Sequence, residues 1–193
     1  LFAYYQSCFI AKLVAYALVF SGSLFCVISI YFYKVCLTRS STTLPLGIFN
    51  MIIQPLADQL FIGTQINDAE DIAQITKLGI RTVICNRPDQ EEPGQPTFAT
   101  VQQWLADAGI QNIVLQAVTA PAITAADGAK LEQLLADAEQ PVLTYCRTGT
   151  RCALLWGFGQ AKQGRPVAEI IAAATAAGVD ISGAEARLQA EQS

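Results

Sequence analysis

Hydrophobic and polar positions divide the chain into two parts near residue 50. Residues 13–33 form a run without a charged residue, flanked by Lys12 and Lys34. A helix of that length spans about 31 Å, enough to cross the apolar core of a bilayer. The run therefore predicts one transmembrane helix. The basic residues after it, which include Arg39, place residues 34–193 on the cytoplasmic side by the positive-inside rule.

A second interpretation of residues 1–50 stays open. The chain begins with Leu1, and its only methionine is Met51, where the polar part begins. Residues 1–50 are then translated upstream sequence, and the natural protein begins at Met51. On this interpretation the protein is cytoplasmic; on the first it is a single-pass membrane protein. Contact with a membrane is expected only if residues 1–50 are native.

From Met51 onward, short β-type runs alternate with amphipathic runs. This alternation predicts an α/β domain over residues 51–193, with a mainly parallel four-stranded sheet flanked by helices. The predicted strands are 60–62, 81–85, 112–118 and 141–145. The predicted helices are 67–78, 97–108, one beginning at 124, 151–163, 167–177 and a last short one after 182.

Capping residues mark several helix starts. Asn67 with Glu70 three residues later predicts the first start, and Thr97 predicts the second. Thr124 with Asp127 has the spacing of a capping box.

Charge and composition exclude several function classes. Residues 51–193 hold all 16 acidic residues but only nine of the 12 Lys and Arg, so this part is acidic. Nucleic acid is not an expected partner, because binding phosphates needs a basic face. The chain has no histidine, which excludes Ser-His-Asp triads, Cys-His pairs and His-bearing zinc sites. Its six cysteines lack a C-x-x-C motif and fit a reduced compartment.

The segment after the strand at 141–145 has the pattern of an oxyanion-binding loop. It reads Cys146, four residues including Gly149, and then Arg151, and a predicted helix follows at once. Backbone N–H groups at a helix N-terminus bind anions, and glycine allows the tight turn that such a loop needs. The planar guanidinium of Arg151 binds two oxygens of a phosphate-like group. We therefore expect Arg147, Thr148, Gly149, Thr150 and Arg151 to form an anion-binding site.

Cys146 is the predicted nucleophile. The helix dipole and the loop amides lower the pKa of a thiol at this position, so a thiolate forms without a histidine base. Thr148 or Thr150 is placed to donate a hydrogen bond to the thiolate or to the leaving group. The alternative is a buried, inert cysteine in an ordinary turn.

Four segments resemble the phosphatase-like domain family of beta-lactamase-hydrolase-like proteins, which has a dual-specificity-phosphatase type of fold. They are residues 56–63, 79–84, 86–94 and 146–151. The resemblance covers most of residues 51–193 and none of 1–50. It implies a Cys-dependent hydrolase with Cys146 as nucleophile and Arg151 as the anion-binding arginine.

The chain departs from the phosphatase pattern in the length of the loop. Related phosphatases have five residues between Cys and Arg, whereas this chain has four. The shorter loop is also similar to the active loop of rhodanese-type sulfurtransferases, in which the cysteine carries a persulfide. Sulfur transfer is therefore the alternative function. A catalytically inactive module that only binds anions is the third.

The general acid is the second departure. Related phosphatases carry an aspartate about thirty residues before the cysteine, and that region has no acid here. Asp127 and Asp89 are the candidates. Asp127 has an alternative role in a capping box, and Asp89 as a solvated turn residue.

Cys152 lies six residues after Cys146. It is a candidate resolving thiol that forms a reversible disulfide with Cys146; the alternative is a small residue in place of serine. No metal or organic cofactor is expected. The expected partners are a small anionic substrate, a phosphoprotein or a thiol acceptor.

Overall fold

The computed structural model describes residues 51–192. The transmembrane helix predicted for residues 13–33 therefore lies outside the described residues. Within residues 51–192, no helix is long and apolar enough to cross a membrane.

The centre of the domain is a five-stranded sheet in the order β1-β2-β5-β3-β4. Three pairs of neighbours are parallel, and only β1 pairs antiparallel, with β2. The prediction of a mainly parallel sheet flanked by helices is confirmed. The strands are β1 (Ile53–Ala57), β2 (Leu60–Gly63), β3 (Thr82–Cys85), β4 (Asn112–Leu115) and β5 (Val142–Tyr145).

The predicted number of four strands is wrong, because β1 was missed. Its sequence, IQPLA, contains a proline and buries only Leu56, so it lacks the apolar pattern of a central strand. Pro55 is tolerated because β1 lies at the edge of the sheet and has one hydrogen-bonded neighbour. The strand predicted at 112–118 is also shorter, ending at Leu115.

Six α-helices and two short 3-10 helices complete the described domain. The α-helices are α3 (Ala69–Lys77), α4 (Phe98–Asp107), α5 (Ala125–Ala136), α6 (Thr150–Lys162), α7 (Val167–Ala176) and α8 (Glu185–Ala190). The 3-10 helices are η2 (Ala120–Ala122) and η3 (Ser182–Ala184).

The helix starts follow the capping chemistry in two of three predicted cases. Thr97 caps α4, and Thr124 forms a capping box with Asp127 at the start of α5. The predicted cap Asn67 is wrong by one residue. Asp68 caps α3 because its carboxylate accepts hydrogen bonds from the first free N–H groups of the helix.

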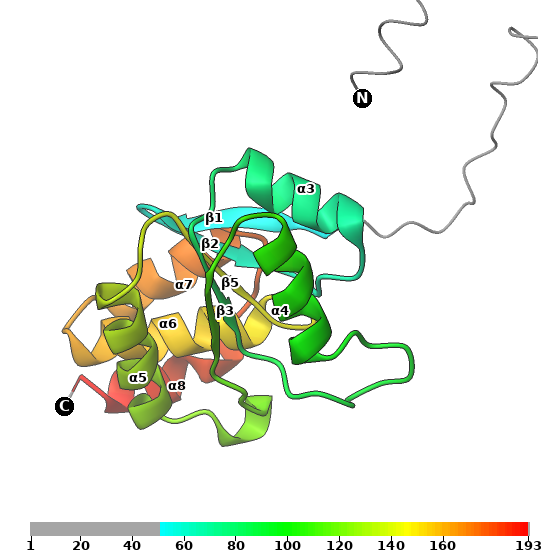
Figure 1. The fold of residues 1–193 in the computed structure, drawn as a ribbon. Helices are drawn as coiled ribbons and strands as arrows, with labels where there is room; N and C mark the ends of the chain where they lie inside the picture. The colour runs from blue at the N-terminus through cyan, green and yellow to red at the C-terminus, as the bar shows by residue number, and fades with distance from the viewer. Residues whose placement is uncertain (1–50, 193) are drawn as a thin grey trace, which may run out of the picture. The chain divides into compact units, whose positions relative to one another are not determined.

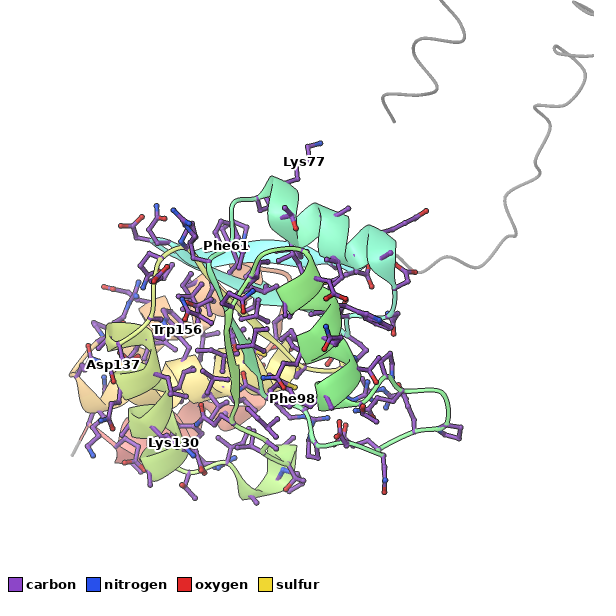
Figure 2. All side chains as sticks on the ribbon, viewed as in Figure 1. Phe61, Lys77, Phe98, Lys130, Asp137 and Trp156 are labelled. Atoms are coloured by element: carbon purple, nitrogen blue, oxygen red, sulfur yellow. The ribbon has the colours of Figure 1, made fainter. Side chains whose placement is uncertain are left out.

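Helices cover both faces of the sheet (Figure 1). Helices α3 and α4 pack on one face, over a core that includes Ile75 and Leu105. Helices α5 to α8 pack on the other face, over a core built around α6. In the side-chain view, Trp156 of α6 lies within this second layer, whereas Lys77 at the end of α3 points away from the domain (Figure 2).

Strand register brings the site together. Strands β3 and β5 are parallel neighbours, and Cys85 pairs with Tyr145 at their carboxyl ends. The loop that begins with Asn86 and the loop that begins with Cys146 therefore leave the same edge of the sheet. Ligands of such sheets bind at this edge.

Candidate active site

The loop after β5 closes onto the N-terminus of α6 through Gly149. Gly149 is the N-cap of α6 and has a φ of 86°. A side chain there would be strained, and its Cβ would also lie 3.3 Å from Cγ2 of Val179. Because this turn is tight, the first free N–H groups of α6 point toward Cys146.

Cys146 is a buried thiol in a field that favours its ionised form. Its side chain is 1% exposed, and its Sγ accepts a hydrogen bond of 3.1 Å from the Gly149 N–H. The Cys152 thiol, followed by the N–H groups of Thr148 and Arg151, lowers the pKa of Cys146 to about 5, although burial opposes the shift. Cys146 is therefore a thiolate at neutral pH.

Cys152 is the neutral partner of this thiolate. It is fully buried, and burial together with its hydrogen bond to Cys146 raises its pKa well above the ordinary value. It therefore stays protonated and donates to Cys146. The structure places the two thiols together, and the resolving role of Cys152 stays a prediction.

Arg151 is held in place by two acceptors. Its Nη2 lies 2.7 Å from Oε2 of Glu91, and its Nη1 donates to the Val118 carbonyl at 3.1 Å. Its side chain is 11% exposed. Two fixed acceptors leave the guanidinium with one orientation, at the start of the helix that carries Cys152 and follows Cys146.

The remaining predicted anion-binding residues lie at the rim of the loop. Arg147 is 62% exposed, and its Nε pairs with Oε2 of Glu92 at 3.2 Å. The hydroxyls of Thr148 and Thr150 lie 3.1 Å apart and bond to each other. No described hydrogen bond joins either hydroxyl to Cys146.

Two glutamates of the loop between β3 and α4 contact the arginines of the site. From the sequence, Glu92 and Asp89 are alternative partners of Arg87, and Glu91 has no predicted role. Arg151 lowers the pKa of Glu91, and Arg87 lowers the pKa of Glu92, so both stay ionised. Two sequence signals pointed to this loop: segment 86–94 of the family resemblance contains both glutamates, and the loop follows β3, the parallel neighbour of β5.

Both candidate general acids are engaged at helix starts. Oδ1 of Asp89 accepts a hydrogen bond of 2.7 Å from the Phe98 N–H, the first residue of α4. The Asp127 carboxylate accepts from the N–H and hydroxyl of Thr124 at 2.9 and 2.8 Å. Asp127 also lines a cavity of about 280 Å³ beside Val118, whose carbonyl holds Arg151. No described contact joins either carboxylate to Cys146.

A metal-binding cluster is not present in the described part of the chain, where no three Cys, Asp or Glu side chains converge suitably. The expectation of a site without metal or cofactor stays a prediction.

The strands and the Cys146 loop fall within a match to a known family. Residues 53–163 match the family model of the beta-lactamase hydrolase-like protein, phosphatase-like domain. The chain belongs to this family. The resemblance inferred from the sequence is therefore confirmed.

Curated members of this family are longer than the present chain. A beta-lactamase hydrolase-like protein of Agrobacterium fabrum is 38% identical over 95 residues, which are 49% of this chain and 22% of that protein. One from Xylella fastidiosa is 34% identical over 116 residues, 60% of this chain and 26% of that protein. The matched region thus spans about a quarter of these relatives.

Solved structures place the family fold among phosphatases. A candidate phosphatase from Neisseria meningitidis is 50% identical, with a TM-score of 0.69, covering 72% of this chain and 97% of its own. The catalytic core of a PP-IP phosphatase from S. cerevisiae shares the fold at 14% identity and a TM-score of 0.52, over 71% of this chain and 83% of its own. The described domain therefore has the fold that these two proteins share.

Proposed function

We propose that the protein is a Cys-dependent hydrolase of small phosphate esters. The supporting observation is the Cys146 thiolate, held by the loop amides and the Cys152 thiol at the N-terminus of α6. Arg151 and the loop amides bind the phosphate oxygens. The Cys146 sulfur attacks phosphorus and displaces the ester oxygen. Water then attacks the phosphocysteine, so phosphate leaves and the thiolate is restored.

The expected substrate has a good leaving group. Protonation of a leaving oxygen by a positioned acid is worth about 10²–10⁴-fold. Asp89 and Asp127, the two candidate acids, are both engaged in hydrogen bonds at helix starts. We therefore expect aryl phosphates to react faster than alkyl phosphates, and a phosphoprotein substrate to carry its phosphate on an aryl oxygen.

Sulfur transfer is the second candidate. It is favoured by the engagement of Asp89 and Asp127 at helix starts, because sulfur transfer needs no general acid. The Cys146 thiolate attacks the outer sulfur of thiosulfate, and sulfite leaves with the electron pair of the broken S–S bond. The persulfide then passes its outer sulfur to a thiol acceptor or to cyanide. Neither step needs a general acid, and the four-residue spacing between Cys146 and Arg151 fits this chemistry.

Paired turnover assays separate the two functions. The full chain is purified as wild type and as Cys146→Ser, with Cys85→Ser as a matched control because Cys85 is also buried but lies outside the loop. One assay supplies an aryl phosphate, and the other supplies thiosulfate with cyanide. Cys146-dependent phosphate release supports the hydrolase. Thiocyanate formation without phosphate release overturns it in favour of sulfur transfer.

The inactive-module alternative has its own result. Sulfate binding that survives Cys146→Ser, together with no turnover in either assay, supports a module that binds anions without reacting.

We also propose residues 51–193 as the phosphatase-like domain.

A further inference from the structure

Arg87 is a buried cation close to the candidate site. It directly follows Asn86 after β3, and its side chain is 1% exposed. A buried guanidinium without partners costs free energy, so the groups that contact Arg87 must compensate its charge. Its Nη1 donates to Oε1 of Gln65 at 2.8 Å, its Nε donates to Oε2 of Glu91 at 2.9 Å, and its Nη2 lies 2.8 Å from Oε1 of Glu92.

Each of these two carboxylates also holds one arginine of the anion loop. Oε2 of Glu91 is shared between Arg87 and Arg151, at 2.9 and 2.7 Å. Glu92 pairs with Arg87 through Oε1 and with Arg147 through Oε2. One buried guanidinium therefore connects to both loop arginines, through one glutamate each.

The third partner of Arg87 fixes this arrangement to the scaffold. Gln65 is 8% exposed, and its Nε2 donates to the Ile66 carbonyl at 2.9 Å. The Gln65 N–H donates to the Arg147 carbonyl at 3.4 Å, within the loop itself. The segment after β2, the loop after β3 and the loop after β5 thus converge on Arg87.

We propose that Arg87 is a positioning residue of the anion site. It orients Arg151 through Glu91 and Arg147 through Glu92, so that both guanidinium groups are in place before an oxyanion arrives. Fixing these long side chains in advance lowers the entropy lost on binding. This inference deepens the proposed function. It rests on one part of that function, namely that the loop binds an oxyanion.

A charge-preserving substitution tests this role. Arg87→Lys keeps the positive charge, but an ammonium cannot reproduce the fixed geometry of the guanidinium, which makes two hydrogen bonds, to Gln65 and Glu91, and an ion pair with Glu92. The full chain carrying Cys146→Ser is titrated with sulfate by calorimetry, with and without Arg87→Lys. Arg165→Lys is the matched control, since Arg165 pairs with Glu169 and lies against Trp156. We expect sulfate affinity to fall about tenfold for Arg87→Lys, which is within the effect of displacing a binding group by about 1 Å.

A double-mutant cycle shows whether Arg87 acts through Glu91. Glu91 is partly exposed, so Glu91→Gln is tolerated by the fold even if Arg87→Lys is not. We expect Glu91→Gln alone to weaken sulfate binding, and the two substitutions together to cost less than the sum of their separate effects, because the part of the Arg87 effect that passes through Glu91 is already lost. A merely structural Arg87 gives additive losses, which overturns the proposal.

Two further results also overturn the proposal. One is tighter sulfate binding by Glu91→Gln, which means that Glu91 competes with the anion instead of orienting Arg151. The other is no sulfate binding by Cys146→Ser. None of these measurements involves turnover, so a failure of the proposed hydrolase in the assays above is distinguishable from a failure of this inference.

Discussion

At the scale of single residues, the chemistry of the site depends on how Cys146 and Cys152 share one proton. The two thiols have the same intrinsic chemistry, but their pKa values move in opposite directions. Both thiols lie in the same apolar core, but Cys146 also accepts hydrogen bonds from the N–H groups of its loop. The environment thus favours the ionised form of Cys146, the proposed nucleophile, and keeps Cys152 protonated as its hydrogen-bond donor.

Replacing Cys152 tests this division. Cys152→Ala removes the largest stabilising contact of the thiolate, so the pKa of Cys146 rises from about 5. A hydrogen bond to a charged group is worth about 1.5–3 kcal/mol, which predicts a rise of about one unit or more. The thiolate fraction at pH 5–6 falls accordingly. The measurement is the pH dependence of iodoacetamide alkylation at Cys146, followed by peptide mass mapping. An unchanged midpoint contradicts the assignment, and Cys85→Ala serves as the control.

Whether Asp89 or Asp127 is the general acid is also a question about single residues. Both side chains accept hydrogen bonds at helix starts, and asparagine keeps an oxygen acceptor there, so the substitutions should cost the fold little stability. We therefore expect Asp89→Asn and Asp127→Asn to change turnover of an aryl phosphate by less than about tenfold, against about 10²–10⁴-fold for a true general acid. The measurement is kcat as a function of pH. A hundredfold loss in either variant, with loss of the basic limb of the profile, would identify that residue as the acid.

At the scale of elements, α5 packs closely against α6, the helix that begins directly after the Cys146 loop. The contact passes through Gly128 of α5, where an added Cβ would lie 2.7 Å from the Gly159 nitrogen and 2.9 Å from the Leu155 carbonyl oxygen. These are backbone atoms of α6, which cannot move aside individually. Any enlargement at Gly128 must therefore shift one helix.

Gly128→Ala is expected to destabilise the domain by about 1–3 kcal/mol, the usual cost of overpacking, despite the better helix propensity of alanine. The measurement is urea unfolding of the full chain. Gly183→Ala is the matched control, because no heavy atom lies within 4 Å of its added Cβ. Equal stability of the two variants would show that the α5–α6 contact is looser than described.

The elements that the sequence predicted correctly are those that depend on local contacts. Thr97 and the Thr124–Asp127 pair act on N–H groups within three residues, so local sequence was sufficient for these helix starts. The pattern around Cys146 is equally local, and its loop lies where a strand–loop–helix pattern places it. Strand β1 was missed because pairing with β2, rather than its own apolar pattern, makes it a strand.

Long-range contacts account for the rest. Glu91 and Arg151 are 60 residues apart, and no local rule joins them. A carboxylate in an acidic loop looks solvated until the order of the strands is known. The sequence could therefore identify the nucleophile and the anion-binding arginine as candidates, but not the residues that orient them.

At the scale of the whole molecule, Met51, the first described residue, is already packed into the domain. Met51 is 3% exposed, and its N–H donates to Oδ1 of Asp71 at 2.7 Å. This contact supports a domain that includes residue 51. At the other end, Leu188 of α8 is fully buried, so the last helix also belongs to the domain.

The packing of α6 has a practical consequence for anyone who shortens this chain. The family match ends at residue 163, but Gly157 faces Ile170, Ile181 and Leu188 from the segment beyond it. Residues 152–159 of α6 are all buried, and α5, α7 and α8 pack against this helix. A fragment cut at the family limit would uncover an apolar face of α6, the helix that follows the Cys146 loop. Such a fragment would lower its free energy by associating with other copies, so a preparation of it would report on aggregation instead of chemistry.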